Sequence, residues 1–554
     1  MPNVVLDNRK ILTVSGETTG GGNLTGDRTI GLANIAAITP NTYGNTTTYP
    51  SIQVDKKGRV VNVVSLSFSN AYMANTILES PRIIGRITKN GHWVTPYILA
   101  GADHDCSGIG GVDQTAKFAN ALIETNATGR ELYLEPGYYD VYANAFINIT
   151  TSGVSIKGAG RNSSYIRNLA SSGNTLTFQN QFPHVSDVTF WPLAYRSSGS
   201  EIALNGTYQG MIENTLFQYH RQAVDVFNCA TPEVKSSLAL YCYGFENFKM
   251  HGNASIGTYG AIINDVIFNN APTLPQGLYS AWGFNKLFNV GELTYVDGWI
   301  LQCTQTGTTA SSGAIVVAFP NSYSWTQTDI THGGAKFRPQ QTTPLTHILQ
   351  DNYGYSLQIK NAICLNGAYA YRMTDTANTG TSAPMWMDGI QMVSDHAFFG
   401  GIYASHGSDI NLGVGTWLGS TLHGSGVAAV DQFKGPFKML QARVMGNAHN
   451  GMYHLAGKKF HLAYNVFAAN GYESIGNFND IYIAPNINDF DYSHNSFGPE
   501  NGLGTNYTNY GILLDAGTSD GYVMAFNRGN GLISSVVYDG GTGLNKYVDQ
   551  NLNW

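Results

Sequence analysis

Hydrophobic and polar positions change their period within residues 102–168. Residues 112–124 repeat apolar side chains at the spacing of one helix face, and Asp113 stands where a helix N-cap is expected. Residues 130–141 and 153–168 instead alternate apolar and polar side chains, the period of a β-strand, and each run contains a glycine turn. This order predicts one short helix followed by strands separated by turns. The apolar face of the predicted helix consists of Ala116, Phe118, Ala119, Leu122 and Ile123.

The strand pattern returns near the C-terminus as a repeat. The segments FHLAYNVF, FDYSHNSF and YVMAFNRG align as alternating apolar positions that lead to an aromatic residue or histidine and then to asparagine. Their asparagines, Asn465, Asn495 and Asn527, are 30 and 32 residues apart, which fits one solenoid coil per interval. We expect these asparagines to stack at a turn and to satisfy backbone groups. Weaker copies of the repeat surround Asp187, Glu213, Glu246 and Asp265. We interpret Glu213, Glu246 and Asp265 as structural turn residues.

The helix, the strands and the repeat together predict an all-β fold, a right-handed parallel β-helix. We expect the helix to cover the open end of the solenoid, where bare strand edges would otherwise invite aggregation. A chain of 554 residues is long enough for this body and a separate N-terminal unit. We predict four parts: a small β module at 1–70, a linker at 71–101, the β-helix at 102–530 and a C-terminal closing segment at 531–554.

The N-terminal unit contains a predicted hairpin. Ile52 and Val54 alternate with polar neighbours, a turn follows at 55–58, and Val60 begins the return strand. The stretch TPNTYG and the hairpin VDKKGRV resemble a module of bacteriophage tail fibre and tailspike proteins. With the 113–168 entrance, the chain resembles bacteriophage tailspikes of the pectate-lyase-like β-helix superfamily. It departs from their compact GDGxxDDT run by spreading its acids over Asp103, Asp105 and Asp113.

The resemblance implies a function and a set of partners. Such a spike binds, and often cuts, the surface polysaccharide of a bacterial host. It is a homotrimer, and the N-terminal module faces the phage virion proteins. The resemblance therefore implies a virion component that is made in the host cytoplasm.

Composition agrees with a turn-rich β protein and argues against other classes. Charged residues make up 12% of the chain, and the net charge of −7 includes no dense basic stripe, so nucleic acid is not an expected partner. The chain contains no run of 18 apolar residues, so membrane insertion is not expected. The first residues lack the apolar core of a signal peptide. The five cysteines are far apart and contain no CxxC pair, so neither disulfides nor a zinc site is expected.

Hydrolysis of a glycosidic bond needs two carboxyl groups, one to protonate the leaving oxygen and one to activate water or attack carbon. Each acid that we consider has an alternative role as a solvated turn residue, and we expect any working pair to form across coils or subunits. The candidate catalytic acids are Glu292, Asp297, Asp388, Asp395, Asp329 and Asp351. Aromatic side chains are able to stack on sugar rings. The alternative role of each aromatic residue is packing within a loop. The candidate substrate-binding residues are Trp282, Trp299, Trp325, Tyr323, Trp386 and His396.

Two other chemistries remain open or are disfavoured. A polysaccharide lyase needs a base beside a neutralised uronate, and His396, His406 and Arg372 are available without a distinguishing spacing. The histidines His449, His454 and His461 do not have a fixed metal-ligand pattern, so no metal or cofactor is expected. The sequence favours a hydrolytic tailspike, with a non-catalytic receptor-binding spike, a lyase and a structural spacer as alternatives.

Overall fold

The structure is a computed structural model that divides into two compact units, Met1–Thr95 and Pro96–Trp554. It describes short strands of the first unit and most of residues 97–553 of the second. The longer gaps in the second unit are residues 143–148, 270–281, 314–328, 340–345, 376–384 and 499–506.

The described part of the first unit consists of two-stranded antiparallel pairs. The longest pair is a hairpin in which Ile52 lies opposite Val63. The predicted turn at 55–58 lies outside the described residues. The strands of this unit are β1 (Ile11–Leu12), β2 (Thr18–Gly20), β3 (Gly22–Asn23), β4 (Ile30–Leu32), β5 (Thr48–Val54), β6 (Val60–Ser67), β7 (Arg86–Ile87) and β8 (Trp93–Val94).

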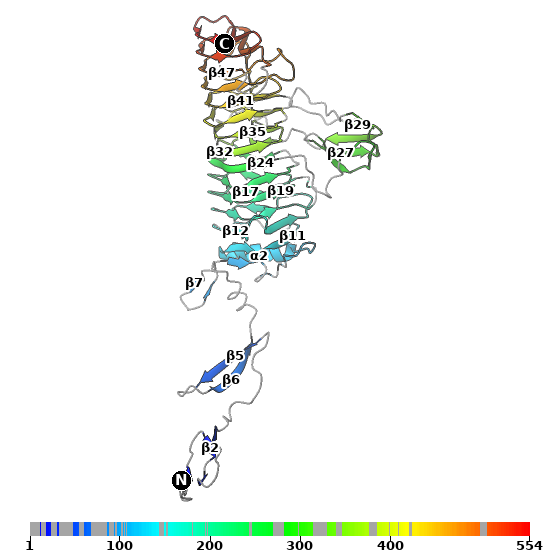
Figure 1. The fold of residues 1–554 in the computed structure, drawn as a ribbon, viewed down its shortest axis with the longest axis vertical. Helices are drawn as coiled ribbons and strands as arrows, with labels where there is room; N and C mark the ends of the chain where they lie inside the picture. The colour runs from blue at the N-terminus through cyan, green and yellow to red at the C-terminus, as the bar shows by residue number, and fades with distance from the viewer. Residues whose placement is uncertain are drawn as a thin grey trace, which may run out of the picture. The chain divides into compact units, whose positions relative to one another are not determined.

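The second unit confirms the predicted all-β fold. It is a parallel β-solenoid of the right-handed type with about 13 turns, whose coils stack in one column in Figure 1. Each full coil contributes one strand to each of three faces, and every strand pairs in parallel with its counterpart in the next coil. We number these faces in the order in which the chain crosses them.

Strands β24 and β32 are long enough to cross faces 1 and 2 without interruption. Face 1 contains β9 (Tyr97–Leu99), β10 (Glu131–Leu134), β12 (Ser155–Gly158), β15 (His184–Ser186), β18 (Met211–Glu213), β21 (Glu233–Lys235), the first half of β24 (Ala261–Asn269), the first half of β32 (Ser356–Leu365), β34 (Trp386–Ile390), β37 (Asp409–Leu412), β40 (Phe437–Leu440), β43 (Phe460–Ala463), β46 (Phe490–Ser493), β49 (Tyr522–Ala525) and β52 (Lys546–Asp549). Face 2 contains β11 (Gly137–Val141), β13 (Ser164–Asn168), β16 (Thr189–Phe190), β19 (Leu216–Gln218), β22 (Leu238–Leu240), the second halves of β24 and β32, β35 (Val393–Asp395), β38 (Trp417–Gly419), β41 (Arg443–Met445), β44 (Val466–Ala468), β47 (Ser496–Phe497), β50 (Arg528–Gly529) and β53 (Leu552–Asn553).

Face 3 is a separate sheet of 12 strands, all parallel. It contains β14 (Leu176–Phe178), β17 (Ile202–Asn205), β20 (Val224–Phe227), β23 (Glu246–His251), β31 (Thr346–Gln350), β33 (Tyr369–Met373), β36 (Gly400–Ala404), β39 (Ser425–Ala429), β42 (Met452–His454), β45 (Ile481–Ile483), β48 (Tyr510–Gly517) and β51 (Ser535–Gly541). Because side chains alternate across a strand, each face sends one set of rows into the lumen and one set to the outside.

The predicted helix exists, but three residues further along the chain. Helix α2 spans Thr115–Thr128, with Gln114 at the N-cap position. Asp113 nevertheless accepts a hydrogen bond from the backbone N–H of Thr115 at 2.9 Å. Ala116 and Ile123 are exposed, contrary to the predicted face. The buried residues of the helix are Phe118, Ala121, Leu122 and Thr125. The three apolar ones join the solenoid core beside β9, β10 and β11. Its role as a protective cap stays a prediction.

The predicted asparagine stack is confirmed, and it extends one coil further than the repeat indicated. Asn465, Asn495, Asn527 and Asn551 form a ladder between faces 1 and 2. In each step one asparagine donates its backbone N–H and its side-chain Nδ2–H to the Oδ1 of the next, at distances from 2.9 to 3.3 Å. Each side-chain amide also donates to a backbone carbonyl, as Asn495 does to Leu462 at 2.9 Å. The ladder therefore satisfies buried backbone groups where the chain bends.

One coil contains a large insertion between faces 2 and 3. The chain leaves the solenoid after β24 and returns at β31. Between them it forms the four-stranded antiparallel sheet β26-β27-β30-β29 and the pair β25–β28, which together lie beside the column in Figure 1. We call this segment, residues 270–345, the inserted module. Its strands are β25 (Leu287–Phe288), β26 (Leu293–Val296), β27 (Trp299–Gln305), β28 (Gly307–Thr308), β29 (Ile330–His332) and β30 (Ala335–Pro339).

Replacing Asn495 with alanine should destabilise the solenoid by on the order of 3 kcal/mol, because it leaves the buried Asn465 N–H and the Leu462 carbonyl without partners. Thermal unfolding followed by circular dichroism measures the effect. Asn545→Ala, at an exposed turn, is the control and should change the melting temperature little. Equal losses in both variants would contradict a special role for the ladder.

Asp480 is fully buried and receives hydrogen bonds from Asn470 Nδ2 at 2.7 Å and Thr508 Oγ1 at 3.2 Å. Burial raises the pKa of Asp480 to about 7. The folded state therefore holds this proton more tightly than the unfolded chain. The stability that the proton contributes is complete below about pH 4 and is lost as the pH rises toward 7.

Asp480→Asn should accordingly stabilise the protein at pH 8, by on the order of 4 kcal/mol, and change little at pH 4. Melting temperatures at the two pH values test this. Asp520→Asn is the matched control, because hydrogen bonds from Asn545 lower the pKa of the Asp520 carboxyl. This variant should give no stabilisation at pH 8. A benefit of Asp480→Asn that is the same at both pH values would contradict the assignment.

Candidate functional site

Charged side chains gather on the outer surface of face 3, in the coils next to the inserted module. Asp225 of β20 lies opposite Lys249 of β23. Glu246 begins β23 opposite Thr346 of β31, and Asp351 directly follows β31. Phe248 of β23 points into the core, so its neighbour Lys249 points outward. Three carboxyl groups from three successive coils lie near enough for the charges of Asp225 and Asp351 to act on Glu246, and we call Asp225, Glu246 and Asp351 the carboxylate site.

Two basic side chains contact this site. His251 Nε2 lies 3.0 Å from Asp225 Oδ1, and Lys249 Nζ lies 3.8 Å from Asp351 Oδ2. Glu246 and Asp351 are nearly enclosed, at 8% and 2% exposure, whereas about a quarter of the Asp225, Lys249 and His251 side chains is exposed. Solvent therefore reaches the site on the side of Asp225.

The enclosure of Glu246 changes its acidity. Burial raises the pKa of Glu246 above its ordinary value, and the negative charges of Asp225 and Asp351 raise it further. Lys249 and Arg221 act in the opposite direction and leave the net shift upward. Groups of carboxyls with one raised pKa are typical of acid–base catalysis, since one member keeps its proton while another is ionised.

The inserted module is tied to face 3 in the coils that follow β31. Phe399 packs against the small core of the module, which includes Phe288 and Phe337. The same Phe399 ring lies 5.8 Å from that of Tyr369, which in turn lies 5.4 Å from Tyr403. The module therefore borders the face that carries the carboxylate site.

A second acidic pair lies on the outside of face 1. Asp409 is paired with Trp386 in the preceding coil, and Asp388 is two residues further along that strand. Asn411 donates to Asp388 at 3.0 Å. Burial raises the pKa of Asp409, and the charge of Asp388 raises it further, against Lys438. This pair combines two predicted residues, Asp388 and Trp386, with an acid that the sequence did not single out.

The remaining described candidates have local structural roles. In the inserted module, Glu292 accepts hydrogen bonds from Asn289, and Trp282 stacks on Phe288 with ring centroids 5.7 Å apart. Asp329 accepts hydrogen bonds from Arg338 and Thr304, which lower its pKa.

Asp395 pairs with His396 at 3.0 Å where face 2 ends. The predicted acids Asp351, Asp388 and Asp395 thus belong to three different faces and do not form one site. The side chains of four further candidate site residues lie outside the described part of the structure. Asp297, Tyr323 and Trp325 lie outside the described residues, and Trp299 lies in β27 with its side chain outside the description.

Glu246 and Asp225 are the site residues that the sequence analysis missed. The repeat pattern predicts that Glu246 is a structural turn residue, but Glu246 is the first residue of β23 and is nearly enclosed. Asp225 and Glu246 lie on successive coils. Asp351 lies on the next coil, although residues 270–345 separate it from Glu246 in the sequence. The long insertion hid this regular spacing.

The three histidines that were considered as metal ligands each contact a different residue. His449, His454 and His461 contact Glu473, Tyr492 and Asp491 respectively. Within the described residues, no group of three or more His, Cys, Asp or Glu is arranged to hold a metal ion. The described part of the chain also contains no helix with the length and hydropathy of a membrane span.

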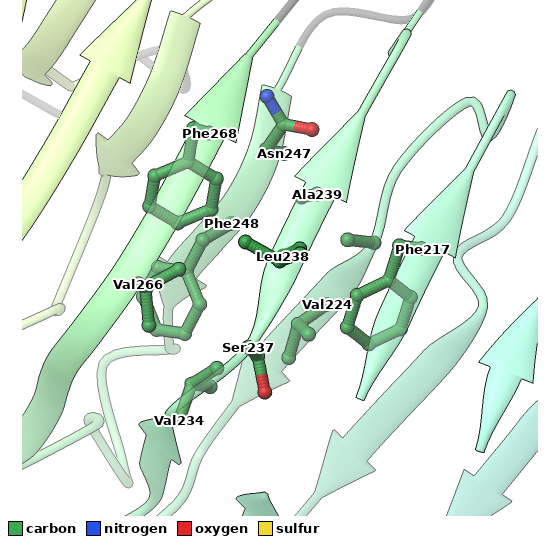
Figure 2. Close-up of a pocket in the computed structure, with 11 residues that line it drawn as sticks. Phe217, Val224, Val234, Ser237, Leu238, Ala239, Asn247, Phe248, Val266 and Phe268 are labelled. Carbon is green, nitrogen blue, oxygen red and sulfur yellow. The ribbon is translucent and has the colours of Figure 1, made fainter. Parts of the chain in front are cut away.

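A cavity in the lumen is not a substrate site. It is lined by residues of β19 to β24, among them Phe217, Leu238 and Phe268, and Asn247 and Ser237 are its polar members (Figure 2). Its volume of about 10 Å³ has room for one water molecule at most. This cavity therefore has no room for a sugar ring.

No family model matches this chain, and no curated protein matches it either. Phage tailspikes are among the solved structures that resemble it: tailspike protein 3 of bacteriophage CBA120 is 12% identical, with a TM-score of 0.49 over 89% of this chain and 70% of that one. The A-module of an Azotobacter vinelandii mannuronan C-5 epimerase is 11% identical, with a TM-score of 0.49 over 82% and 99%. PfbA, a surface adhesin of Streptococcus pneumoniae, is 11% identical, with a TM-score of 0.41 over 80% and 93%.

Proposed function

We propose that this chain is a bacteriophage tailspike that binds the surface polysaccharide of a bacterial host and depolymerises it by hydrolysis at the carboxylate site. The observation that carries the proposal is the placement of Asp225, Glu246 and Asp351 on adjacent coils of face 3, where the charges of Asp225 and Asp351 act on Glu246 and its pKa is raised. A long, rigid β-sheet face suits an extended sugar chain, and the phage-like segments TPNTYG and VDKKGRV support the biological setting.

The roles of the carboxyls follow from their surroundings. Glu246, whose raised pKa keeps it protonated to higher pH, is the general acid for the leaving oxygen. Asp225 is the second carboxyl, because it is the most exposed of the three and lies beside His251. Asp351 and Lys249 form an ion pair that fixes charge behind the reacting groups. The site therefore contains both of the groups that glycoside hydrolysis requires.

The wider setting of the protein belongs to the same proposal. The spike is a homotrimer and a component of the virion, and its N-terminal module binds other virion proteins. These inferences rest on the resemblance of residues 20–63 and 113–168 to phage spikes.

A polysaccharide lyase is the second candidate. It is favoured by the 3.0 Å contact between His251 and Asp225, which orients an imidazole as a base, and by Lys249 beside it, which is able to neutralise a uronate. A lyase leaves an unsaturated sugar that absorbs ultraviolet light, whereas a hydrolase leaves new reducing ends only. The non-catalytic spike differs from both, because it binds glycan that stays intact.

The purified protein should shorten the surface polysaccharide of at least one bacterium in a panel of candidate hosts, with new reducing ends and no ultraviolet absorbance. Glu246→Gln should lower that rate by at least about 100-fold, because the general acid is lost. Glu213→Gln, an equivalent change in a half-buried residue of face 1, is the matched control and should keep full activity.

Asp409→Asn distinguishes the two acidic sites. Full activity is expected, since Asp409 lies on face 1. A loss confined to Asp409→Asn, with Glu246→Gln unaffected, would move the catalytic site to the pair on face 1. Binding without cleavage by the unmodified protein would leave the adhesive spike as the function.

Lys249→Gln should move the alkaline limb of the pH–rate profile to higher pH, by about one pH unit. The positive charge of Lys249 lowers the pKa of Glu246, so its removal lets the general acid keep its proton further into the alkaline range. Lys235→Gln on face 1 should leave the profile unchanged. A shift of the limb to lower pH in Lys249→Gln would show that Glu246 does not act as the acid.

A further inference from the structure

A chain of buried polar side chains runs along the inner corner between faces 2 and 3, in the coils that carry the carboxylate site. His220 Nε2 lies 2.7 Å from Asn247 Oδ1, and Asn247 Nδ2 lies 2.8 Å from His347 Nδ1. His347 Nε2 lies 2.9 Å from the carbonyl oxygen of Leu365. The four residues belong to four successive coils, and the three side chains are at most 1% exposed.

The hydrogen bonds fix the direction and the charge state of this chain. The amide of Asn247 donates through Nδ2, so His347 accepts at Nδ1 and donates from Nε2 to the Leu365 carbonyl. His220 donates from Nε2 to the Asn247 oxygen. Burial lowers the pKa of His347 to about 3 and that of His220 to about 4, so both rings are neutral at ordinary pH.

The position of His347 explains why such a chain is useful. It is the second residue of β31, the strand with which the polypeptide re-enters the solenoid after the inserted module. In other coils a short turn restricts how a strand is placed on its neighbour. The connection that precedes β31, residues 270–345, restricts it little, because the free energy of closing a loop changes only slowly with length.

Apolar packing alone does not specify the position of β31. A slip by one residue turns Ile348 away from the core, but a slip by two residues preserves the alternation of inward and outward side chains. Such a slip separates Asn247 from His347 and leaves both buried without partners, at about 1–3 kcal/mol for each group. It also moves Asp351 along the strand by about 7 Å.

We propose that the hydrogen-bonded chain His220–Asn247–His347 sets the register of β31 on β23 and so places Asp351 against Lys249. His347 is therefore a positioning residue of the carboxylate site. It touches no substrate and acts through the strand on which it lies. The catalytic meaning of this placement rests on the proposed function, whereas the placement itself does not.

The test measures the placement without substrate. A water-soluble carbodiimide joins Lys249 to Asp351 only where the two side chains touch, and peptide mass spectrometry quantifies the product. His347→Leu, which removes both hydrogen bonds of the ring, should lower the yield by at least fivefold. His347→Gln, which keeps an acceptor and a donor, should restore it to within twofold.

His454→Leu is the matched control. His454 is equally buried on the inner side of face 3, in β42, where it bonds Tyr492 at 2.6 Å. Its replacement should lower the melting temperature but leave Lys249–Asp351 coupling unchanged. If His347→Leu yields no folded protein, Asn247→Ser, which shortens one partner only, takes its place with the same expected loss.

Coupling at the wild-type yield in a folded His347→Leu or Asn247→Ser variant would overturn the proposal, whatever happens to polysaccharide cleavage. Lost coupling in a protein that cleaves no glycan would support the register lock and refute the enzymatic function. A depolymerase in which His347→Leu lowers coupling and cleavage together, and His347→Gln restores both, would support the two proposals jointly.

Discussion

The parallel register between consecutive coils is the constraint on which the rest of this structure depends. Each strand contributes only a few residues, so its inward side chains reach the core only if they align with the rows above and below. The same alignment produces the asparagine ladder from Asn465 to Asn551 and brings Asp225 to Lys249. Core, turns and carboxylate site are thus consequences of one stacking relation.

Polar groups inside the solenoid support this relation in a way that apolar packing cannot. Apolar rows tolerate a shift that preserves their alternation, whereas a hydrogen bond between Asn495 and Asn527 tolerates none. Such groups therefore contribute more to the choice of one register than to net stability, because their hydrogen bonds replace others made to water. Asp480 is the exception, since burial works against its ionised form.

Much of the fold was predictable from the sequence, because the signals were local and repeated. Alternation predicted the strands, and the spacing of Asn465, Asn495 and Asn527 predicted the coil length and the ladder. The helix begins three residues later than its apolar pattern predicted, and the residues that it buries lie against β9, β10 and β11. The carboxylate site was not predicted as a unit. Asp351 was named as a candidate, but Glu246 resembled a turn residue and the insertion concealed the coil spacing that unites them.

The inserted module has a consequence for how such a protein diversifies. It is attached at one corner of one coil, and within a solenoid each coil contacts mainly its neighbours. The module is therefore a cassette: another segment of different length or shape is compatible with the same body, provided that its last strand returns in place. The surface beside the carboxylate site is then free to change without any alteration of the residues that form the site.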